Sequence, residues 1–342
     1  MTLSRLELHQ FRSHHDNSFS FSPGVNSITG KNASGKTNIL EAIYVLATGK
    51  SFRDSDSDLT EYDCNWWKII GTFGGVKREA RYYNGVKTFI IDGNEYKRLP
   101  VQKYIPTVLF EPDDLFLVHG QPAKRRAYID MTVGIVTPGY KTVLKRFERA
   151  LAQRNRLLKS NTAVDHDMLF VWDMMLAEQA AIIVDHRRKI VDVWNKRLGY
   201  LYQNIVPGET TITVEYKSNL PMTTYKQSLL HALKSSVDHD TITGSTRYGP
   251  HRDDIVFYRD GKDCVTSASR GEVRSLLLAL KKNEAELLEM FHQTAPLLLW
   301  DDVLSELDTS RHSALINSHM GSQLIITSTD WHADHTAHHI SL

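Results

Sequence analysis

The first 110 residues of the chain alternate between apolar and polar positions over short stretches, which predicts a β-rich region. The stretches lie at residues 3–8, around Phe19 and Phe21, and at 66–73, 79–83 and 88–91. Turn-forming pairs follow the last three stretches, at Gly74-Gly75, Asn84-Gly85 and Asp92-Gly93. Asn-Gly and Asp-Gly favour tight hairpin turns, so we expect these strands to form an antiparallel meander.

The middle of the chain, from Pro112 to Pro207, has helical periodicity instead. Residues 137–159 and 167–205 carry apolar side chains at three- and four-residue spacing, and a short polar segment links them. Two long helices with a short link predict an antiparallel helical hairpin. The outer faces of both helices are rich in Arg and Lys. This pattern fits a solvated surface and a DNA-contacting surface equally well.

Strands and helices alternate again after Pro207. The expected elements are a strand at 210–216, helices at 222–234 and 273–291, a strand at 296–302, a helix at 311–318 and a strand at 323–327. The strand at 296–302 is almost entirely apolar before its two final acids, which is typical of a strand buried in a parallel sheet.

The most informative motif is the run from Gly30 to Thr37, which fits the phosphate-binding pattern G-x-x-x-x-G-K-[ST]. A short strand precedes it, and an apolar helix follows, with Gly49 as the expected C-terminal stop. Backbone N–H groups of such a loop surround a phosphate, and the helix N-terminus adds partial positive charge. Lys36 would reach the outer phosphates of ATP or GTP, and the Thr37 hydroxyl would ligate Mg²⁺. The predicted nucleotide-binding positions are Gly30, Lys31, Asn32, Ala33, Ser34, Gly35, Lys36 and Thr37.

A second half of the nucleotide site is predicted at the end of the apolar strand near residue 300. Asp301 follows this strand directly, and its carboxylate can hold Mg²⁺ from the side opposite Thr37. Asp302 comes next, where a second carboxylate could orient the attacking water. Together with Lys36, Asp301 and Asp302 form the predicted catalytic set.

Another phosphate-seeking surface is predicted at the start of the helix near residue 270. Ser269, Arg270, Gly271 and Glu272 combine a hydroxyl, a glycine amide and a helix N-terminus. The loop at 30–37 already forms a complete phosphate-binding site within one chain. A second phosphate-binding surface therefore predicts that each nucleotide is also contacted by another subunit. The same residues also fit an ordinary serine N-cap.

Composition narrows the class of protein without identifying it. The 342 residues carry a formal net charge of +1, with 41% hydrophobic and 24% charged residues, so any DNA-binding surface must be local. Two distant cysteines, Cys64 and Cys264, form no CxxC pair, which is typical of a reducing cytosol and disfavours a zinc module. No apolar run is long enough to span a membrane, and the alternating N-terminus does not resemble a signal peptide. We therefore expect a cytoplasmic protein without a membrane partner.

The order of these motifs resembles the ABC-type ATPase heads, the group that includes the SMC proteins. Phe11-Arg12-Ser13-His14, the phosphate loop, the helix-opening serine, the strand ending in Asp and the Ser305-Glu306-Leu307-Asp308 loop follow one another as in that group. Within the group, the whole chain resembles the RecF family. The most specific segments are 112–130, 248–254 (YGPHRDD) and 301–311 (DDVLSELDTSR).

The resemblance implies an α/β fold made of an ABC-type ATPase head and a helical-hairpin lobe. The head would consist of a phosphate-loop sheet with an antiparallel β meander. Residues 1–111 would form the N-terminal part of the ATPase lobe, 112–207 the helical-hairpin lobe, and 208–342 the C-terminal part of the ATPase lobe. By the same resemblance, Arg12 belongs to the nucleotide-binding set and Asp308 lies at the dimer seam.

The resemblance also implies a function. It implies a cytoplasmic, ATP-dependent DNA-binding protein of recombinational repair, replication and the SOS response. Such a protein binds single-stranded, double-stranded and gapped DNA and helps to load recombinase with a RecR-type mediator protein. ATP with Mg²⁺ would drive homodimerisation, and weak DNA-dependent hydrolysis would reset this switch. The alternative is a P-loop transferase or a transporter-type ATPase subunit, which would bind gapped DNA no better with ATP than without it.

Two departures from the group's pattern bear on the predicted site. Glu272 stands where the motif usually has Gln, which adds a negative charge near the expected phosphate. The switch histidine expected after Ile326 is absent, which leaves Thr327 or Thr329 to take its place.

Overall fold

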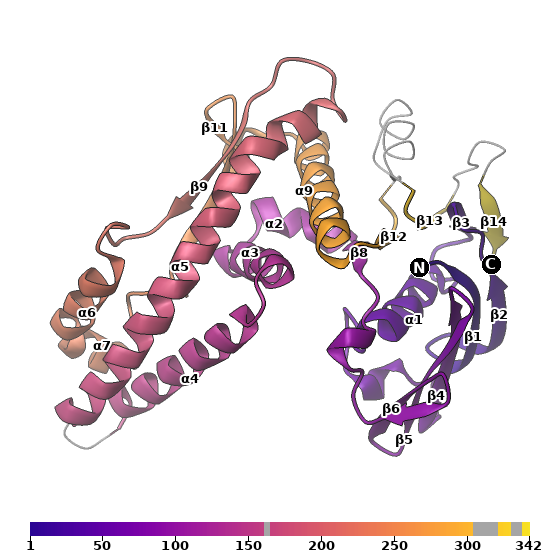
Figure 1. Ribbon diagram of the computed structural model, residues 1–342, viewed down its shortest axis with the longest axis horizontal. Helices are drawn as coiled ribbons and strands as arrows, with labels where there is room; N and C mark the ends of the chain where they lie inside the picture. The colour runs from indigo at the N-terminus through magenta and orange to yellow at the C-terminus, as the bar shows by residue number, and fades with distance from the viewer. Residues whose placement is uncertain (161–164, 304–320, 330–336) are drawn as a thin grey trace. The chain divides into compact units, whose positions relative to one another are not determined.

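The computed structural model describes residues 1–160, 165–303, 321–329 and 337–342. The chain divides into two compact units, both drawn in Figure 1. Unit 1 comprises Met1–Asp114 and Leu280–Leu342, and unit 2 comprises Leu115–Ala279. No helix among the described residues is long and apolar enough to cross a membrane.

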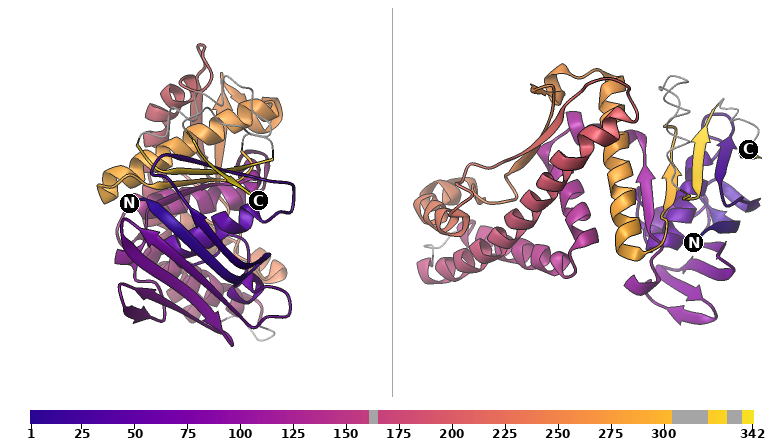
Figure 2. Two further views of the ribbon diagram at one scale, coloured as in Figure 1. Left: turned by 90° about the vertical axis from the view of Figure 1, so that its right-hand side faces the viewer. Right: turned by 45° about the horizontal axis from the view of Figure 1, so that its top comes forward.

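Unit 1 contains a six-stranded antiparallel sheet in the order β2-β1-β4-β5-β6-β7, whose strands lie side by side in the left view of Figure 2. Its strands are β1 (Leu3–Phe11), β2 (His14–Ser20), β4 (Trp66–Phe73), β5 (Val76–Tyr83), β6 (Val86–Ile91) and β7 (Asn94–Tyr96). The turns between β5 and β6 and between β6 and β7 have positive φ at Asn84, Gly85, Asp92 and Gly93. This is the backbone of tight hairpin turns, so the predicted meander is confirmed.

A second sheet in unit 1 is five-stranded and parallel, in the order β14-β3-β13-β12-β8. Its strands are β3 (Val25–Thr29), β8 (Thr107–Phe110), β12 (Leu297–Trp300), β13 (Leu324–Ser328) and β14 (His338–Ser341). Every residue of β12 and β13 is buried, as the continuous apolar run predicted. The predicted strand at 296–302 is shortened to the four residues Leu297–Trp300.

Helix α1 (Lys36–Thr48) packs against strands of both sheets, and one hydrophobic core joins all three elements. Ile39, Leu40 and Ile43 are fully buried, as their spacing predicted. The helix ends at Gly49, which has φ of 84° and donates its N–H to the Val45 carbonyl at 2.9 Å. The predicted glycine stop is therefore confirmed, and the start of α1 is fixed between two sheets.

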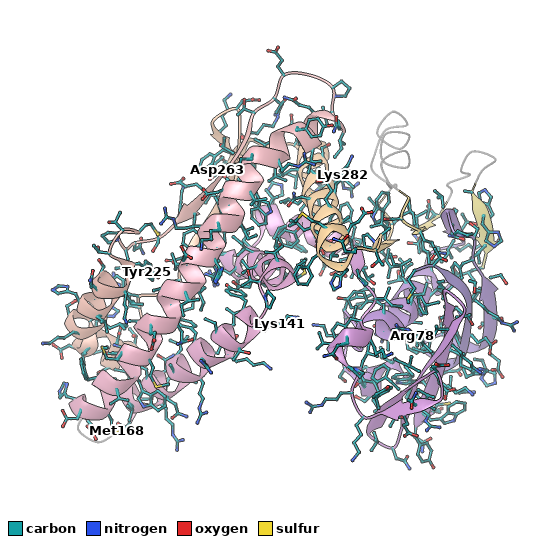
Figure 3. All side chains as sticks on the ribbon, viewed as in Figure 1. Arg78, Lys141, Met168, Tyr225, Asp263 and Lys282 are labelled. Atoms are coloured by element: carbon teal, nitrogen blue, oxygen red, sulfur yellow. The ribbon has the colours of Figure 1, made fainter. Side chains whose placement is uncertain are left out.

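Unit 2 is mostly helical. Its elements are α2 (Phe116–His119), α3 (Pro122–Val136), α4 (Tyr140–Leu158), α5 (His166–Gln203), β9 (Ile212–Lys217), α6 (Tyr225–Ser235), α7 (Val237–Thr243), β10 (Asp254–Arg259), β11 (Lys262–Asp263), α8 (Cys264–Ser267) and the first part of α9 (Arg270–His292). Helices α4 and α5 pack against each other, which confirms the predicted hairpin. Figure 3 shows Lys141 at the start of α4 and Met168 at the opposite end of the hairpin, near the start of α5.

The division into units differs from the sequence-based boundary at residue 208. Strand β9 pairs with β10 in an antiparallel ladder and packs against α5. Residues 208–279 therefore belong to the helical unit, and the C-terminal part of unit 1 begins inside α9 at Leu280. The periodicity of the sequence changes at Pro207, whereas the division into units follows the pairing of distant strands.

A buried charge cluster holds four segments of unit 2 together. The guanidinium of Arg154, on α4, is fully buried and donates to Asp173 Oδ1 on α5 at 2.6 Å and to Asp240 Oδ2 on α7 at 2.7 Å. It also donates to Thr246 Oγ1 at 2.9 Å. Burial raises the pKa of Asp173, although Arg154 opposes this shift. Each charge in the cluster thus depends on its partner for compensation.

Candidate nucleotide site

The phosphate loop lies between β3 and α1 and has the backbone that its sequence predicted. Gly35 has φ of 95° and Ala33 has φ of 65°. A Cβ atom at Gly35 would lie 2.7 Å from both Ser13 Oγ and His14 Nε2, so this position needs glycine for its conformation and for space. The segment that carries Ser13 and His14 therefore packs directly against the loop.

Polar groups of the loop are arranged to receive an anion. Lys36 Nζ donates to the carbonyl oxygens of Gly30 and Lys31 at 2.7 and 2.8 Å, which holds the ammonium across the loop. Ser34 Oγ is buried and has no hydrogen-bond partner among the described residues. A buried hydroxyl without a partner and a positive side chain at a helix N-terminus fit a nucleotide phosphate.

The carboxylate of Asp301 faces the first turn of α1. It lies just after β12, is 7% exposed, and accepts from Thr37 Oγ1 with both oxygens at 2.9 Å. Thr327 Oγ1, on the neighbouring strand β13, donates to Asp301 Oδ1 at 2.8 Å. Of the two threonines that the sequence left open, Thr327 is thus the one that holds Asp301. A hydroxyl facing a carboxylate is a donor set that Mg²⁺ prefers.

Asp302 follows in a left-handed conformation with φ of 48°. Its backbone N–H donates to Thr327 Oγ1 at 2.9 Å, so a single hydroxyl fixes both acids. The positive φ turns the chain sharply after the strand.

Arg12 is partly buried and forms ion pairs that the sequence did not predict. Its Nε and Nη2 atoms both donate to Glu41 at 2.9 Å, and Nη2 also donates to Asp54 at 2.5 Å. Burial lowers the pKa of Arg12, but the hydrogen bonds to the two carboxylates outweigh it and raise the pKa above its usual value. Glu41 is fully buried on α1 and also accepts from Ser51 Oγ at 2.5 Å. The signal in the sequence was a glutamate within the apolar stripe of the helix.

The predicted trans surface forms the N-terminus of α9 in unit 2. Ser269 N and Oγ both donate to Glu272 Oε2, at 2.8 and 2.9 Å, and Glu272 N lies 3.4 Å from Ser269 Oγ. This is a capping box. Glu272 Oε1 is also 2.6 Å from Arg259 Nη1. The expected extra negative charge is therefore paired within unit 2, and the serine N-cap that the sequence admitted is present.

The structure places most of the predicted site residues in unit 1 and the predicted trans surface in unit 2. The loop residues 30–37, Asp301 and Asp302 meet in unit 1, whereas residues 269–272 belong to unit 2. Asp308 and the helix expected at 311–318 lie outside the described residues. The structure adds Glu41 to the site, and it selects Thr327 from the two threonines that the sequence left open.

A phosphate loop between a strand of a parallel sheet and a helix that packs on an antiparallel meander, facing a carboxylate at the end of another strand of the parallel sheet, defines an ABC-type ATPase head. The chain is 36% identical to "DNA replication and repair protein RecF" of Streptococcus suis (strain 05ZYH33), over 96% of this chain and 93% of that protein. Because the identity extends over nearly the full length of both proteins, the chain belongs to the RecF family of DNA replication and repair proteins.

Other comparisons agree with this assignment. The RecF protein of Streptococcus pyogenes serotype M49 is also 36% identical, over 93% of this chain and 89% of its own length. A solved structure of the recombination mediator protein RecF-ATP in the RecFOR pathway has a TM-score of 0.83 at 30% identity, covering 97% of this chain and 93% of that one. An Smc head bound to the C-winged helix domain of ScpA has a TM-score of 0.54 at 17% identity over 96% and 90%, which shows the fold alone. Residues 5–102 match the AAA domain family.

Proposed function

We propose that this chain is an ATP-dependent DNA-binding protein of recombinational repair and replication. It binds single-stranded, double-stranded and gapped DNA, dimerises when it binds ATP, and helps a RecR-type mediator protein to load recombinase in the cytoplasm. A weak, DNA-dependent ATPase activity returns the dimer to monomers. The observation that carries the proposal is the contact between Thr37 and Asp301, which unites the phosphate loop with the acid-ended strand.

The chemistry of the site supports ATP with Mg²⁺. The loop amides and Lys36 bind the phosphates, and Thr37 and Asp301 hold the metal, which neutralises phosphate charge during hydrolysis. Thr327 keeps the Asp301 carboxylate in place. Asp302 accepts the proton of the attacking water, because it is the next carboxylate along the same strand end. Arg12 supports the loop through its pair with Glu41 on α1 and lies within the same network.

One face of unit 2 supports contact with DNA. Helix α4 and Lys159, the residue directly after it, carry six exposed cationic side chains and one exposed acid, Glu148. The cations are Lys141, Lys145, Arg146, Arg149, Arg156 and Lys159. Because the net charge of the whole chain is only +1, this concentration is local. Cations along one helix bind phosphates without reading sequence and make affinity depend steeply on salt.

The start of α9 supports the ATP-dependent dimer. Residues 269–272 lie at the N-terminus of a 23-residue helix, whose first N–H groups and partial positive charge favour a phosphate. Unit 1 already has its own phosphate loop, so the γ-phosphate that this surface receives belongs to a second subunit. RecF is described as a recombination mediator of the RecFOR pathway, which supports the RecR-type partner.

The proposal is tested by measuring molar mass by light scattering without nucleotide, with Mg·ATP, and with Mg·ATP and gapped duplex DNA. We expect a monomer to become a dimer with Mg·ATP, and DNA to be retained in that state. Lys36→Met should abolish ATP binding, and Ser269→Arg should retain ATP binding but remain monomeric. A monomer under every condition that does not bind DNA would overturn the proposal and favour a transferase-like P-loop protein. A Ser269→Arg variant that dimerises normally would contradict the trans site alone.

A further inference from the structure

The segment from Thr246 to Asp254 contains the specific motif 248–254, and three helices hold it through hydrogen bonds to its side chains and backbone. The Thr246 hydroxyl accepts from Arg154 Nη1 on α4 at 2.9 Å. The Pro250 carbonyl accepts from Arg187 Nη1 on α5 at 2.7 Å. The Asp254 carboxylate accepts two bonds from an arginine of α3 at 2.7 and 2.8 Å. A segment held in this way can present its remaining side chains in a fixed geometry.

Three side chains of this segment are presented toward solvent. Arg247 and Arg252 are exposed, and Tyr248 is partly buried. The Arg247 guanidinium lies over the Tyr248 ring, 5.7 Å from its centroid. Arg252 Nε donates to the Thr246 carbonyl at 3.2 Å, which orients the guanidinium. Among the described residues, neither arginine forms an ion pair with a carboxylate, so both keep their charge for a ligand.

Two adjoining hollows lie beside these side chains and share Asn219 and Leu220. One has a volume of about 610 Å³ and is bordered by Tyr248 and by polar residues of α6. The other has a volume of about 410 Å³ and is bordered by Lys217 and Arg252. Together they form one open groove, which we name the β9–α6 groove. Its walls combine an aromatic ring, cations, amides and hydroxyls.

Two acids, Glu215 and Asp254, also line the groove, and both have partners. Asp254 is paired with its arginine on α3, as described above. Glu215 accepts from Tyr258 Oη at 2.8 Å and lies 3.8 Å from Lys217 Nζ. The groove is therefore lined by two cations, Lys217 and Arg252, by two acids that have partners, and by the Tyr248 ring. This combination fits a flexible chain that carries phosphates and unpaired rings.

We propose that the β9–α6 groove binds one single strand of DNA. This inference rests on the proposed DNA-binding function and names where the single-stranded side of a gap binds. In this proposal, Arg252 and Lys217 contact phosphates, and a base stacks on the Tyr248 ring. The Arg247 guanidinium also contacts this ring. A duplex does not offer an unpaired base face for this stacking, so the groove distinguishes a single strand from a duplex.

Fluorescence anisotropy on the full chain tests this proposal, with a labelled oligothymidine and a duplex of equal length, each over a range of salt concentrations. Tyr248→Ala should weaken single-strand binding about tenfold. Arg252→Gln should weaken it as well and reduce the slope of log affinity against log salt by about 0.7, the value for one phosphate of a single strand. Tyr248→Ala should leave that slope unchanged, and both variants should keep the wild-type affinity for duplex.

Matched variants separate a groove effect from a general loss of charge or fold. Tyr248→Phe and Arg252→Lys should retain single-strand binding, because each keeps the ring or the charge. Lys196→Gln removes an exposed cation of α5 outside the groove and should leave single-strand affinity unchanged. Equal losses for single strand and duplex, or unchanged single-strand binding by both groove variants, would overturn the groove. A wild-type protein that binds no DNA would overturn the proposed function as well, which distinguishes the two failures.

Discussion

Thr327 is the residue whose replacement most directly tests the geometry of the nucleotide site. Its hydroxyl donates to Asp301 and accepts from the backbone N–H of Asp302. Thr327→Val preserves the shape and the β-branched character of the side chain but removes both hydrogen bonds. Because Thr327 is fully buried on β13, water does not readily replace the lost hydroxyl. We therefore expect Asp301 to lose its fixed orientation toward Thr37.

The magnitude follows from the type of bond that is lost. A hydrogen bond to a charged group contributes about 1.5–3 kcal/mol, which corresponds to a factor of roughly 10–100 in affinity. Replacing a residue that orients a metal ligand typically lowers metal affinity by a similar factor, about 10–100. Thr327→Val should thus raise the Kd for Mg·ATP by about 10–100-fold. Binding of ATP in the presence of a chelator should change by less than about twofold, because the loop amides and Lys36 are unaffected.

Isothermal titration calorimetry with and without Mg²⁺ measures this difference. Thr327→Ser restores the hydroxyl and should return Mg·ATP affinity close to the wild-type value. If Thr327→Val is folded and binds Mg·ATP as the wild type does, Thr327 does not position Asp301. If affinity falls equally with and without Mg²⁺, the substitution acts on the phosphate loop and the reasoning about the metal ligand is refuted.

Two further predictions concern unit 2. Arg154→Met leaves two buried carboxylates without their cation and should cost about 3–5 kcal/mol of unfolding free energy near neutral pH. Since burial raises the pKa of Asp173 and Arg154 opposes the rise, losing Arg154 lets this carboxyl bind its proton more readily, so the loss should shrink as pH falls. Urea unfolding at about pH 8 and about pH 5 checks this, and an equal loss at both would contradict it. Glu272→Gln should retain the capping bonds of Ser269 but release Arg259, which strengthens ATP-dependent dimerisation measured by light scattering. Weaker dimerisation would instead show that the Glu272–Arg259 pair supports the interface.

Features that depend on local chemistry could be predicted from the sequence. The glycine at residue 49 ends α1 because a left-handed residue without a Cβ is favoured there, and the Asn-Gly and Asp-Gly pairs make the hairpin turns. The phosphate loop is likewise encoded in eight consecutive residues. Asp301 could be placed because a carboxylate after an apolar strand must emerge at the carboxyl edge of a parallel sheet.

Features that depend on pairing between distant segments could not be predicted in this way. Glu41 joins the site through Arg12, 29 residues earlier, and an isolated glutamate in an apolar stripe does not name its partner. The same holds for β9 and β10, whose pairing assigns residues 208–279 to unit 2. Strand register and buried ion pairs are set by the packed core, whereas a sequence pattern shows only the periodicity of each element.

The N-terminus of α9 shows how one pattern can satisfy two structural roles. A serine followed three residues later by glutamate is the sequence of a capping box, and it also places a hydroxyl at a phosphate-seeking helix start. In the structure, Glu272 occupies both donors of Ser269, and Arg259 compensates its charge. A phosphate that binds Ser269 Oγ must therefore displace the carboxylate, while Arg259 is positioned beside the incoming charge. The capping box is therefore compatible with the proposed trans contact, in which a phosphate would replace the Glu272 carboxylate at Ser269.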